Sequence, residues 1–277
     1  MTDRTRIANW VWAWLTTGGS LLVQADYDGA LAPVVDDPAV ALLPQEVRSD
    51  LGTLARSPQS RLALFSGHDI ADLRERVSVS GAIYAGCHGL EIEGPTIAFR
   101  HGEAEILSHL VLDSVHGALA RLALSIPGMR VVSKGLKVVV HCGHVTCADR
   151  ARIHDVLARE VRRHRGRLRL AGGTEAIEIL PWVDWSRGMS ARWIQDQVRP
   201  TLRPPLLTLY LGDVGSDDVV EALAGRAVAI RVGRTAAARP DPPGDAAPVE
   251  PLLSALAAVV RLHRRQPRTL VTREGQR

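Results

Sequence analysis

Short apolar runs that stop at an acidic or small residue recur along this chain and constrain its fold more than any other feature. The runs cover residues 21–25, 62–65, 206–211 and 228–230, and they stop at Asp26, Ser66, Gly212 and Arg231. Helical apolar patterns occupy 44–56, 70–77, 189–198 and 217–223. Continuous apolar strands that alternate with amphipathic helices are typical of a parallel sheet covered on both faces. The sequence therefore predicts an α/β fold.

Polar residues follow three of these runs directly. Asp26 and Asp28 come after the first run, Ser66 after the second, and Asp213 after the third. In open parallel sheets, ligands bind outside the carboxyl ends of the strands. We therefore expect these four residues to share one site.

The middle of the chain has a different pattern. A helix is expected at 104–124, a hairpin or bent strand at 130–141, a second helix at 149–163, and short strands near 168–170 and 176–180. An αββαββ unit of this kind is a plausible cap inserted between core strands. The predicted domains are a core over 1–101, a cap over 102–181, and the rest of the core over 182–277. We expect a surface loop at 235–251, a last helix at 251–264 and a disordered tail after Gln266.

Composition and charge exclude several classes of protein. The 277 residues suffice for one core and one insert, and no apolar run reaches the roughly 18 residues of a membrane span. The apolar stretch 7–22 lacks the basic flank and cleavage site of a secretory signal, so we expect a packed helix on a cytoplasmic protein. The net charge is +4, with a dense basic run at 159–169. A solvated helix face explains this run, and the more specific alternative is that the run binds an anionic partner. No nucleic-acid motif accompanies it, so we expect no nucleic-acid and no membrane partner.

The cysteines favour reduced thiols over a metal site. Three cysteines cannot all pair with each other, and cytosolic disulfides are rare. His141, Cys142, His144 and Cys147 have the residue types of a zinc site, but strand alternation would point neighbours to opposite faces.

The segment Asp26-Tyr27-Asp28-Gly29 places two carboxylates just past a strand. One can attack phosphorus while the other donates and later accepts a proton. Two anions would repel a phosphate, so a hard cation is needed, and Mg²⁺ prefers such oxygen ligands. The alternative is an acidic turn without chemistry.

Three further elements could complete such a site. Ser66 could donate to a phosphate oxygen, or could only cap a helix. The acidic loop 211–218 could supply metal ligands, or could cap the next helix. Arg187 could balance phosphoryl charge, or could be an ordinary surface residue.

Together these motifs resemble the haloacid-dehalogenase-like phosphatases and, more narrowly, the trehalose-6-phosphate phosphatase family. The resemblance runs from about residue 21 to 256. It rests on LLVQADYDGALAPVVDDP, LALFSGHDIADL, YAGCHGLEIEGP, the Lys134-Gly135 and His141 segment, VDWSRG and LYLGDVGSDD. The stretch 84–91 is the most specific of these, because it is particular to this family.

The resemblance implies a Rossmann-like core of the haloacid-dehalogenase type, with a small α/β cap that closes over the sugar. Asp26 is expected to become an aspartyl phosphate. Asp28 is expected to protonate the leaving sugar oxygen and then activate water. Mg²⁺ is expected on the Asp26 carboxylate, the Asp28 carbonyl and Asp213, with Asp217 in support.

The same resemblance implies the groups that hold the substrate, a small sugar phosphate. Ser66 and Arg187 are expected on the phosphate oxygens. Four residues are expected near the sugar, namely His88 and Glu91 of the core and Lys134 and His141 of the cap.

The chain departs from the family pattern at several positions. Ala30 stands where the family has a threonine after DxDG, and Arg187 stands where it has the lysine of the third motif. His68 replaces the arginine of the family's SGR, and Val214 replaces the second acid of its GDD. In the cap, Val132 replaces a glutamate, Lys137 a serine and Gly143 an arginine. The chemistry is expected to persist, while the cap that reads sugar hydroxyls is the most altered part.

Trehalose 6-phosphate, or a disaccharide phosphate like it, is therefore the expected substrate. A pseudo-disaccharide such as validoxylamine A 7′-phosphate is an alternative. A degenerate binder of sugar phosphates is a second alternative, although such a binder has no need of both Asp26 and Asp28. Oligomeric state is left open between monomer and dimer.

Overall fold

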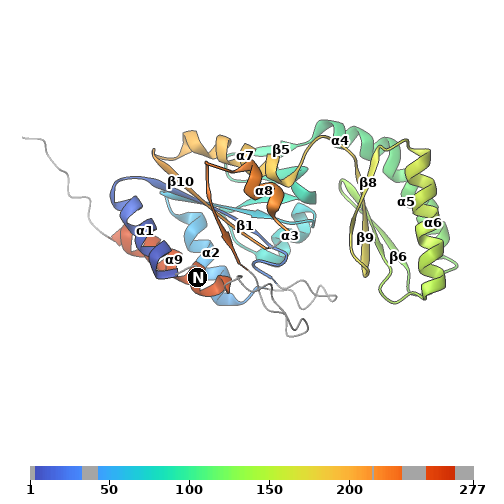
Figure 1. Ribbon diagram of the computed structural model, residues 1–277, viewed down its shortest axis with the longest axis horizontal. Helices are drawn as coiled ribbons and strands as arrows, with labels where there is room; N and C mark the ends of the chain where they lie inside the picture. Colours follow the sequence, from blue (N-terminus) through green and yellow to red (C-terminus); the bar gives the residue numbers. More distant parts are fainter. Residues whose placement is uncertain (1–3, 33–42, 214, 233–247, 266–277) are drawn as a thin grey trace, which may run out of the picture.

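The central layer of the molecule is a seven-stranded sheet with the order β11-β10-β1-β2-β3-β4-β5 (Figure 1). The computed structural model describes residues 4–32, 43–213, 215–232 and 248–265. The strands are β1 (Ser20–Asp26), β2 (Ser60–Phe65), β3 (Ile83–Gly86), β4 (Glu91–Glu93), β5 (Ala98–Arg100), β10 (Leu206–Gly212) and β11 (Val228–Arg231). The strands from β11 to β3 pair in parallel, and β4 and β5 add an antiparallel edge.

Helices cover both faces of this sheet, which explains why the central strands are apolar throughout. All seven residues of β1 are buried. Leu21 and Val23 pack in one apolar cluster, and Leu22 packs in another on the opposite face. The first cluster is covered by α1 (Arg4–Thr16), α2 (Gln45–Arg56), α3 (Ile70–Val77) and α9 (Val249–Arg265). The second is covered by α7 (Arg187–Val198) and α8 (Asp217–Ala222). Two short helices, η2 (Cys87–Gly89) and η4 (Arg199–Thr201), also belong to this part of the chain.

The predicted α/β class is confirmed, with two differences in detail. The apolar stretch 7–22 is not one helix, because α1 ends at Thr16 and β1 begins at Ser20. Gly18 has a φ of 88° in the turn between them, a conformation that favours glycine. Strands β4 and β5 were not predicted, because three residues are too few to display a period.

A second, four-stranded antiparallel sheet has the order β6-β7-β9-β8. Its strands are β6 (Arg130–Lys134), β7 (Lys137–His141), β8 (Leu168–Gly172) and β9 (Ala176–Pro181). Its helices are α4 (Gly102–Leu107), the π-helical segment η3 (Ser108–Leu112), α5 (Asp113–Ala123) and α6 (Cys147–Arg163). These elements lie between residues 102 and 181, and we propose that they form the cap domain.

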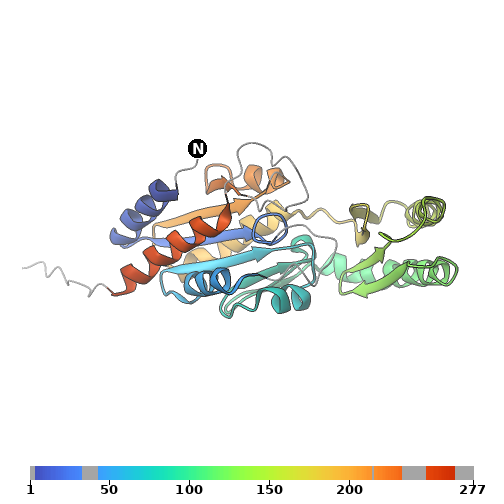
Figure 2. The ribbon, with the colours of Figure 1, turned by 90° about the horizontal axis from the view of Figure 1, so that it is seen from below.

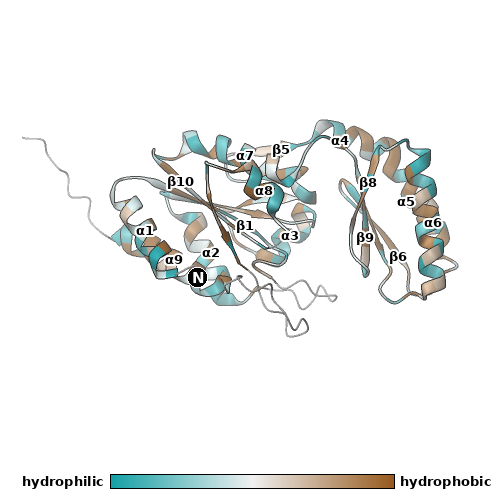
Figure 3. Ribbon diagram, viewed as in Figure 1, coloured by the Kyte–Doolittle hydropathy of each residue, from teal (hydrophilic) through white to brown (hydrophobic). Residues whose placement is uncertain are grey.

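The cap sheet has one face toward its own helices and one toward the core. Val138, Val140, Ile177 and Ile179 pack with residues of α5 and α6 in a separate apolar cluster. Both ribbon views place α5 and α6 on the side of the cap sheet away from the core (Figures 1 and 2). The outer side of α6 is largely hydrophilic (Figure 3). The other face of the sheet is therefore free to meet the core.

The cap touches the core through the turn between β6 and β7. Leu136, in this turn, is fully buried in an apolar cluster with Cys87 and Leu90 of the core and Leu180 of β9. This contact holds the end of the cap sheet near the carboxyl edge of the central sheet.

Three features named from the sequence concern residues outside the described ranges. Most of the predicted loop at 235–251, the tail after Gln266 and the position of Val214 lie outside the described residues. Helix α9 begins at Val249, two residues before the predicted start of the last helix. None of the helices in the described ranges is long and apolar enough to cross a bilayer.

The separate cap core predicts a position-dependent loss of stability. Ile179 is fully buried in the cap cluster, whereas Leu170 of the neighbouring strand is 45% exposed. Ile179→Ala should lower the free energy of unfolding of the cap by about 2–5 kcal/mol, because it leaves a cavity. Leu170→Ala is the matched control and should cost much less. Urea denaturation measures both, and equal losses would contradict this packing.

Candidate active site

The carboxylate of Asp26 is fixed at the carboxyl end of β1. It is 1% exposed, and its Oδ2 accepts hydrogen bonds from the Tyr210 hydroxyl at 2.7 Å and the Ser216 hydroxyl at 2.5 Å. The Arg187 Nη1 lies 3.4 Å from the same oxygen. The other oxygen, Oδ1, is buried and has no hydrogen-bond partner among the described residues. One oxygen is therefore anchored and the other is free.

Burial raises the pKa of Asp26 to about 6, and the charge of Arg187 and the two hydroxyl donors oppose this rise. The carboxylate is thus poorly solvated, with its charge balanced by a cation on α7. A desolvated carboxylate whose orientation is fixed is suited to nucleophilic attack.

Tyr210 is a site residue that sequence reasoning missed. It lies on β10 and is paired in register with Gln24 of β1, two residues before Asp26. Burial raises the pKa of the Tyr210 phenol, so it remains a hydrogen-bond donor. No local sequence signal identifies it, because its role depends on the parallel pairing of two distant strands.

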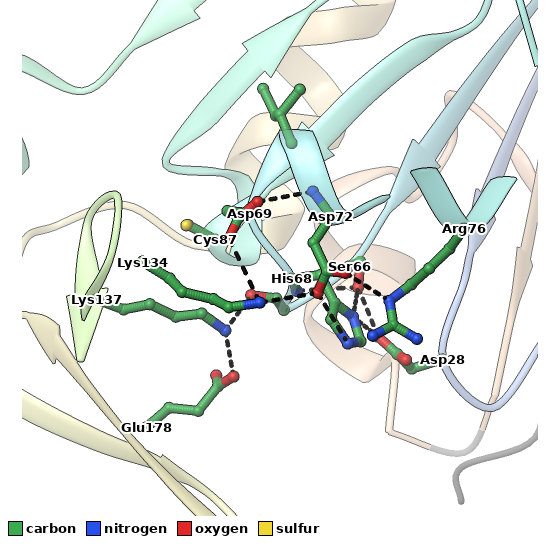
Figure 4. Close-up of polar contacts among 12 residues, drawn as sticks. Asp28, Ser66, His68, Asp69, Asp72, Arg76, Cys87, Lys134, Lys137 and Glu178 are labelled. Carbon is green, nitrogen blue, oxygen red and sulfur yellow. Dashed lines mark hydrogen bonds and ion pairs between the residues drawn. The ribbon is translucent and has the colours of Figure 1, made fainter. Parts of the chain in front are cut away.

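Asp28 occupies the turn that follows Asp26. Its Oδ2 accepts from the Ser66 hydroxyl at 2.7 Å, and the His68 Nδ1 lies 3.5 Å away. The Ser66 hydroxyl also lies 2.7 Å from His68 Nδ1 (Figure 4). Burial raises the pKa of Asp28, but the hydrogen bonds and charge of His68 and the Ser66 hydroxyl outweigh it, so the net shift is downward. The free protein therefore holds Asp28 as a carboxylate.

Asp213 lies over the same turn. Its Oδ1 accepts from the Gly215 N–H at 2.9 Å and from the Ser216 hydroxyl at 3.1 Å. Gly29 in this turn has a φ of 82°, which favours glycine, and a Cβ added there would meet the Asp213 carboxylate. Ser216 thus links Asp213 to Asp26 through one hydroxyl.

Arg187 is the first residue of α7, and Ser186 caps this helix by accepting from the Met189 N–H at 3.1 Å. The Arg187 Nη2 donates to the Gly215 carbonyl at 2.8 Å and lies 3.4 Å from Asp218 Oδ1. One backbone carbonyl and one side-chain carboxylate therefore orient the guanidinium toward Asp26.

Asp217 points away from the other predicted metal ligands. Its side chain is 82% exposed and pairs with Arg231 at 3.5 Å. Its neighbour Asp218 faces inward instead, accepting from the Gly188 N–H at 3.1 Å. Both acids begin the short helix α8, and the sequence did not distinguish which of them points inward.

The residues present fit a magnesium ion. No group of three or more His, Cys, Asp or Glu side chains in the described part of the chain has metal-binding geometry. Mg²⁺, however, needs only one or two carboxylates together with substrate phosphate and waters. The Asp26 carboxylate at the end of β1 and the Asp213 carboxylate beside Gly29 supply that kind of donor set.

The alternative zinc site in the cap would involve His141, Cys142, His144 and Cys147. No such metal-binding group includes Cys142 or its neighbours among the described residues. The Cys142 thiol is buried and donates to the Thr174 carbonyl at 3.6 Å. The cysteines are free thiols, as predicted.

Two cap lysines reach the core beside Ser66 (Figure 4). Lys137 Nζ donates to the Gly67 carbonyl at 2.7 Å and also pairs with Glu178 of β9. Glu178 is in turn 2.7 Å from His88 Nε2 of the core. Lys134 Nζ lies 3.3 Å from Asp72 of α3. His88 and Lys134 thus meet at the contact between core and cap, together with Lys137 and Glu178, which sequence reasoning did not assign to the site.

The other two predicted sugar ligands lie differently. Glu91 is 7% exposed, and its carboxylate accepts from the Ile70 N–H at 2.9 Å and from Arg100 at 3.1 Å. It is thus occupied in holding the start of α3. His141 pairs with Arg130 at the end of β7 that is far from the turn to the core. It lies four residues along β7 from Lys137, on the same face of the cap sheet and within electrostatic range of Lys134 and Lys137.

The family follows from comparison with known proteins. The trehalose-phosphatase family pattern matches residues 24–235. The chain belongs to the trehalose-phosphatase family. The trehalose-phosphate phosphatase of Mycobacterium marinum is 35% identical over 211 residues, and that of Mycobacterium tuberculosis is 33% identical over 213 residues. These alignments cover 75% and 76% of this chain but 52% and 53% of the relatives, so the chain spans about half their length.

Solved structures of this family share the trehalose-phosphatase fold seen here. A trehalose-6-phosphate phosphatase related protein superposes with a TM-score of 0.67 at 16% identity, covering 87% of this chain and 97% of that one. The C-terminal domain of the Candida albicans trehalose-6-phosphate phosphatase gives 0.65 at 16% identity, covering 92% and 96%. The expected haloacid-dehalogenase-like fold is thereby confirmed.

The contact between core and cap predicts a dependence of stability on pH. Burial raises the pKa of Glu178, but His88 and Lys137 outweigh it and hold the pKa at about 2, below the ordinary 4.5. Because this pKa is lowered in the folded protein, the ionised Glu178 carboxylate stabilises the fold fully above pH 4.5, and this contribution is lost as the pH falls toward 2. The difference in unfolding free energy between wild type and Glu178→Gln should therefore shrink over that range.

Urea denaturation of both proteins at pH 7 and near the acid end of that window measures this difference. A difference that stays constant with pH would contradict the ion pairing of Glu178.

Proposed function

We propose that this chain is a Mg²⁺-dependent phosphatase that removes phosphate from trehalose 6-phosphate or a closely similar disaccharide phosphate. The observation that carries the proposal is the Asp26 carboxylate, anchored through Oδ2 by Tyr210 and Ser216 with Oδ1 free. The family relatives, whose printed name is trehalose-phosphate phosphatase, support the substrate class.

In the first step, Asp26 Oδ1 attacks phosphorus and the bond from phosphorus to the sugar oxygen breaks. The electron pair of that bond stays on the sugar oxygen, which takes a proton from Asp28. The products are the free sugar and an aspartyl phosphate on Asp26. Asp28 is ionised in the free protein, and the approach of an anionic phosphate favours its protonation.

In the second step, Asp28 accepts a proton from water, whose oxygen attacks the aspartyl phosphate. The bond from phosphorus to Asp26 Oδ1 breaks, which releases inorganic phosphate and restores the carboxylate. Ser66 and Arg187 flank Asp28 and Asp26 respectively, and we assign both to the phosphate oxygens.

The Asp26 carboxylate, the Asp28 carbonyl and Asp213 would hold Mg²⁺. The ion would supply positive charge against the phosphate oxygens while they are near the two aspartates. Asp213 is kept in place for this by the Gly215 N–H and by Ser216.

The departures from the family pattern are compatible with catalysis. Ala30 is fully buried in the apolar cluster of the core, so its methyl group is packed there. Arg187 retains a cation 3.4 Å from the nucleophile. Retention of an anchored nucleophile favours an enzyme over the degenerate binder.

The cap charges favour a disaccharide phosphate over the pseudo-disaccharide alternative. Lys134, Lys137 and Arg169 place three cations on the cap, against Glu178 of the cap and Asp72 of α3. A substrate bridged by a protonated amine would add a fourth cation to this group.

The first test is phosphate release from trehalose 6-phosphate with Mg²⁺. Asp26→Asn should reduce the rate about 10³-fold or more, because it removes the nucleophile. Asp28→Asn should reduce it about 10²–10⁴-fold, because it removes the proton donor. Asp196→Asn is the matched control, since Asp196 is exposed and pairs with Arg226 away from the site. Activity of Asp26→Asn close to wild type would contradict the proposal.

The metal assignment predicts a difference between two neighbouring acids. Asp213→Asn should raise the Mg²⁺ concentration for half-maximal activity about tenfold or more, because it removes a ligand charge. Asp217→Asn should leave that concentration close to wild type, because the Asp217 side chain is 82% exposed. A titration of Mg²⁺ after treatment with EDTA measures both, and the reverse order would assign the ion to Asp217.

A further inference from the structure

Arg169 is a cation on the cap strand β8. It is half-buried, and the described residues give its guanidinium neither a hydrogen bond nor an ion pair. A guanidinium carries five N–H donors, and leaving them unpaired in a partly desolvated place is costly. Such a group can bind an acceptor that the described residues do not supply.

The register of the cap sheet fixes the direction of this side chain. Arg169 on β8 is paired directly with Leu180 on β9, and directly paired residues share one face of a sheet. Leu180 packs against Cys87 and Leu90 of the core. Leu168, one residue before Arg169, packs on the opposite, helix-covered face. Arg169 therefore points toward the core.

Charged groups on both sides place Arg169 near the active site. Its guanidinium is within electrostatic range of Glu178 on the cap and of Asp218 on α8 of the core. Asp218 lies 3.4 Å from Arg187, which in turn lies 3.4 Å from Asp26. Arg169 thus approaches the nucleophile from the α7–α8 side, whereas Lys134 and Lys137 approach from the α3 side.

The two cap lysines that reach the core already have partners. Lys137 is bound to Glu178 and the Gly67 carbonyl, and Lys134 is bound to Asp72. Glu178 also bonds His88, so its oxygens are engaged. Among these three basic residues of the cap, Arg169 is the one whose donors remain available.

We propose that Arg169 is a specificity-determining residue that donates hydrogen bonds to hydroxyl oxygens of the sugar that leaves. This inference rests on the proposed function and names the cap group that reads the substrate. A planar guanidinium matches two neighbouring oxygen acceptors better than an ammonium does. Because Arg169 belongs to the cap, its contact is with the leaving sugar, while Arg187 and Ser66 serve the phosphate.

Calorimetric binding in an Asp26→Asn background tests this contact, because that background prevents turnover. With Mg²⁺ present, the added Arg169→Gln change should weaken trehalose 6-phosphate binding about tenfold or more, as expected for loss of charged hydrogen bonds. Inorganic phosphate binding should change less than about twofold, since it lacks the sugar. Arg169→Lys should restore only part of the sugar phosphate affinity.

Arg159→Gln is the matched control, since Arg159 is an exposed arginine on α6, behind the cap sheet (Figure 1). Equal effects of Arg169→Gln and Arg159→Gln would overturn the proposal. An equal loss of inorganic phosphate binding would overturn it as well, because Arg169 would then serve the phosphate. If trehalose 6-phosphate bound no tighter than inorganic phosphate with Arg169 intact, the proposed substrate would fail and the sugar contact with it.

Discussion

The parallel pairing of β1 with β10 brings Asp26 beside Tyr210, and the rest of the site is arranged around this carboxylate. Tyr210 and Ser216 anchor one oxygen, and Arg187 balances the charge. Burial would otherwise favour protonation of Asp26, and it raises the pKa to about 6. Among the described residues, the hydrogen-bond donors around Asp26 therefore all bind Oδ2, and Oδ1 stays available for attack on phosphorus.

The cap adds a second set of charges to this arrangement. Lys137, Glu178 and His88 join the two sheets through one continuous set of ion pairs and hydrogen bonds, and Lys134 extends the contact to α3. Lys137 also donates to the Gly67 carbonyl, next to Ser66. Because removing one partner of a partly buried ion pair destabilises the other, the position of the cap is coupled to the loop that carries Ser66. Side chains from both sheets therefore meet beside the candidate active site.

The sequence predicted the elements of the core and the strand ends that carry Asp26, Asp28, Ser66 and Asp213, because buried parallel strands leave a strong apolar signal. It did not assign a site role to Tyr210, Glu178 or Arg169, although Arg169 ends the basic run 159–169. Their roles depend on which residues face each other across strands and across the two sheets, and no local pattern records that. The same limit applies to Asp217 and Asp218, whose directions are decided by the packing of α8 against α7.

The most direct test of this account is chemical trapping of the covalent step. Wild-type protein would be mixed with trehalose 6-phosphate and Mg²⁺, quenched in acid, and reduced with borohydride, which converts an aspartyl phosphate to homoserine. Peptide mass spectrometry would then locate the change. The account predicts homoserine at position 26, dependent on substrate and absent from Asp26→Asn. Turnover without modification at Asp26, or with modification at another carboxylate, would contradict it.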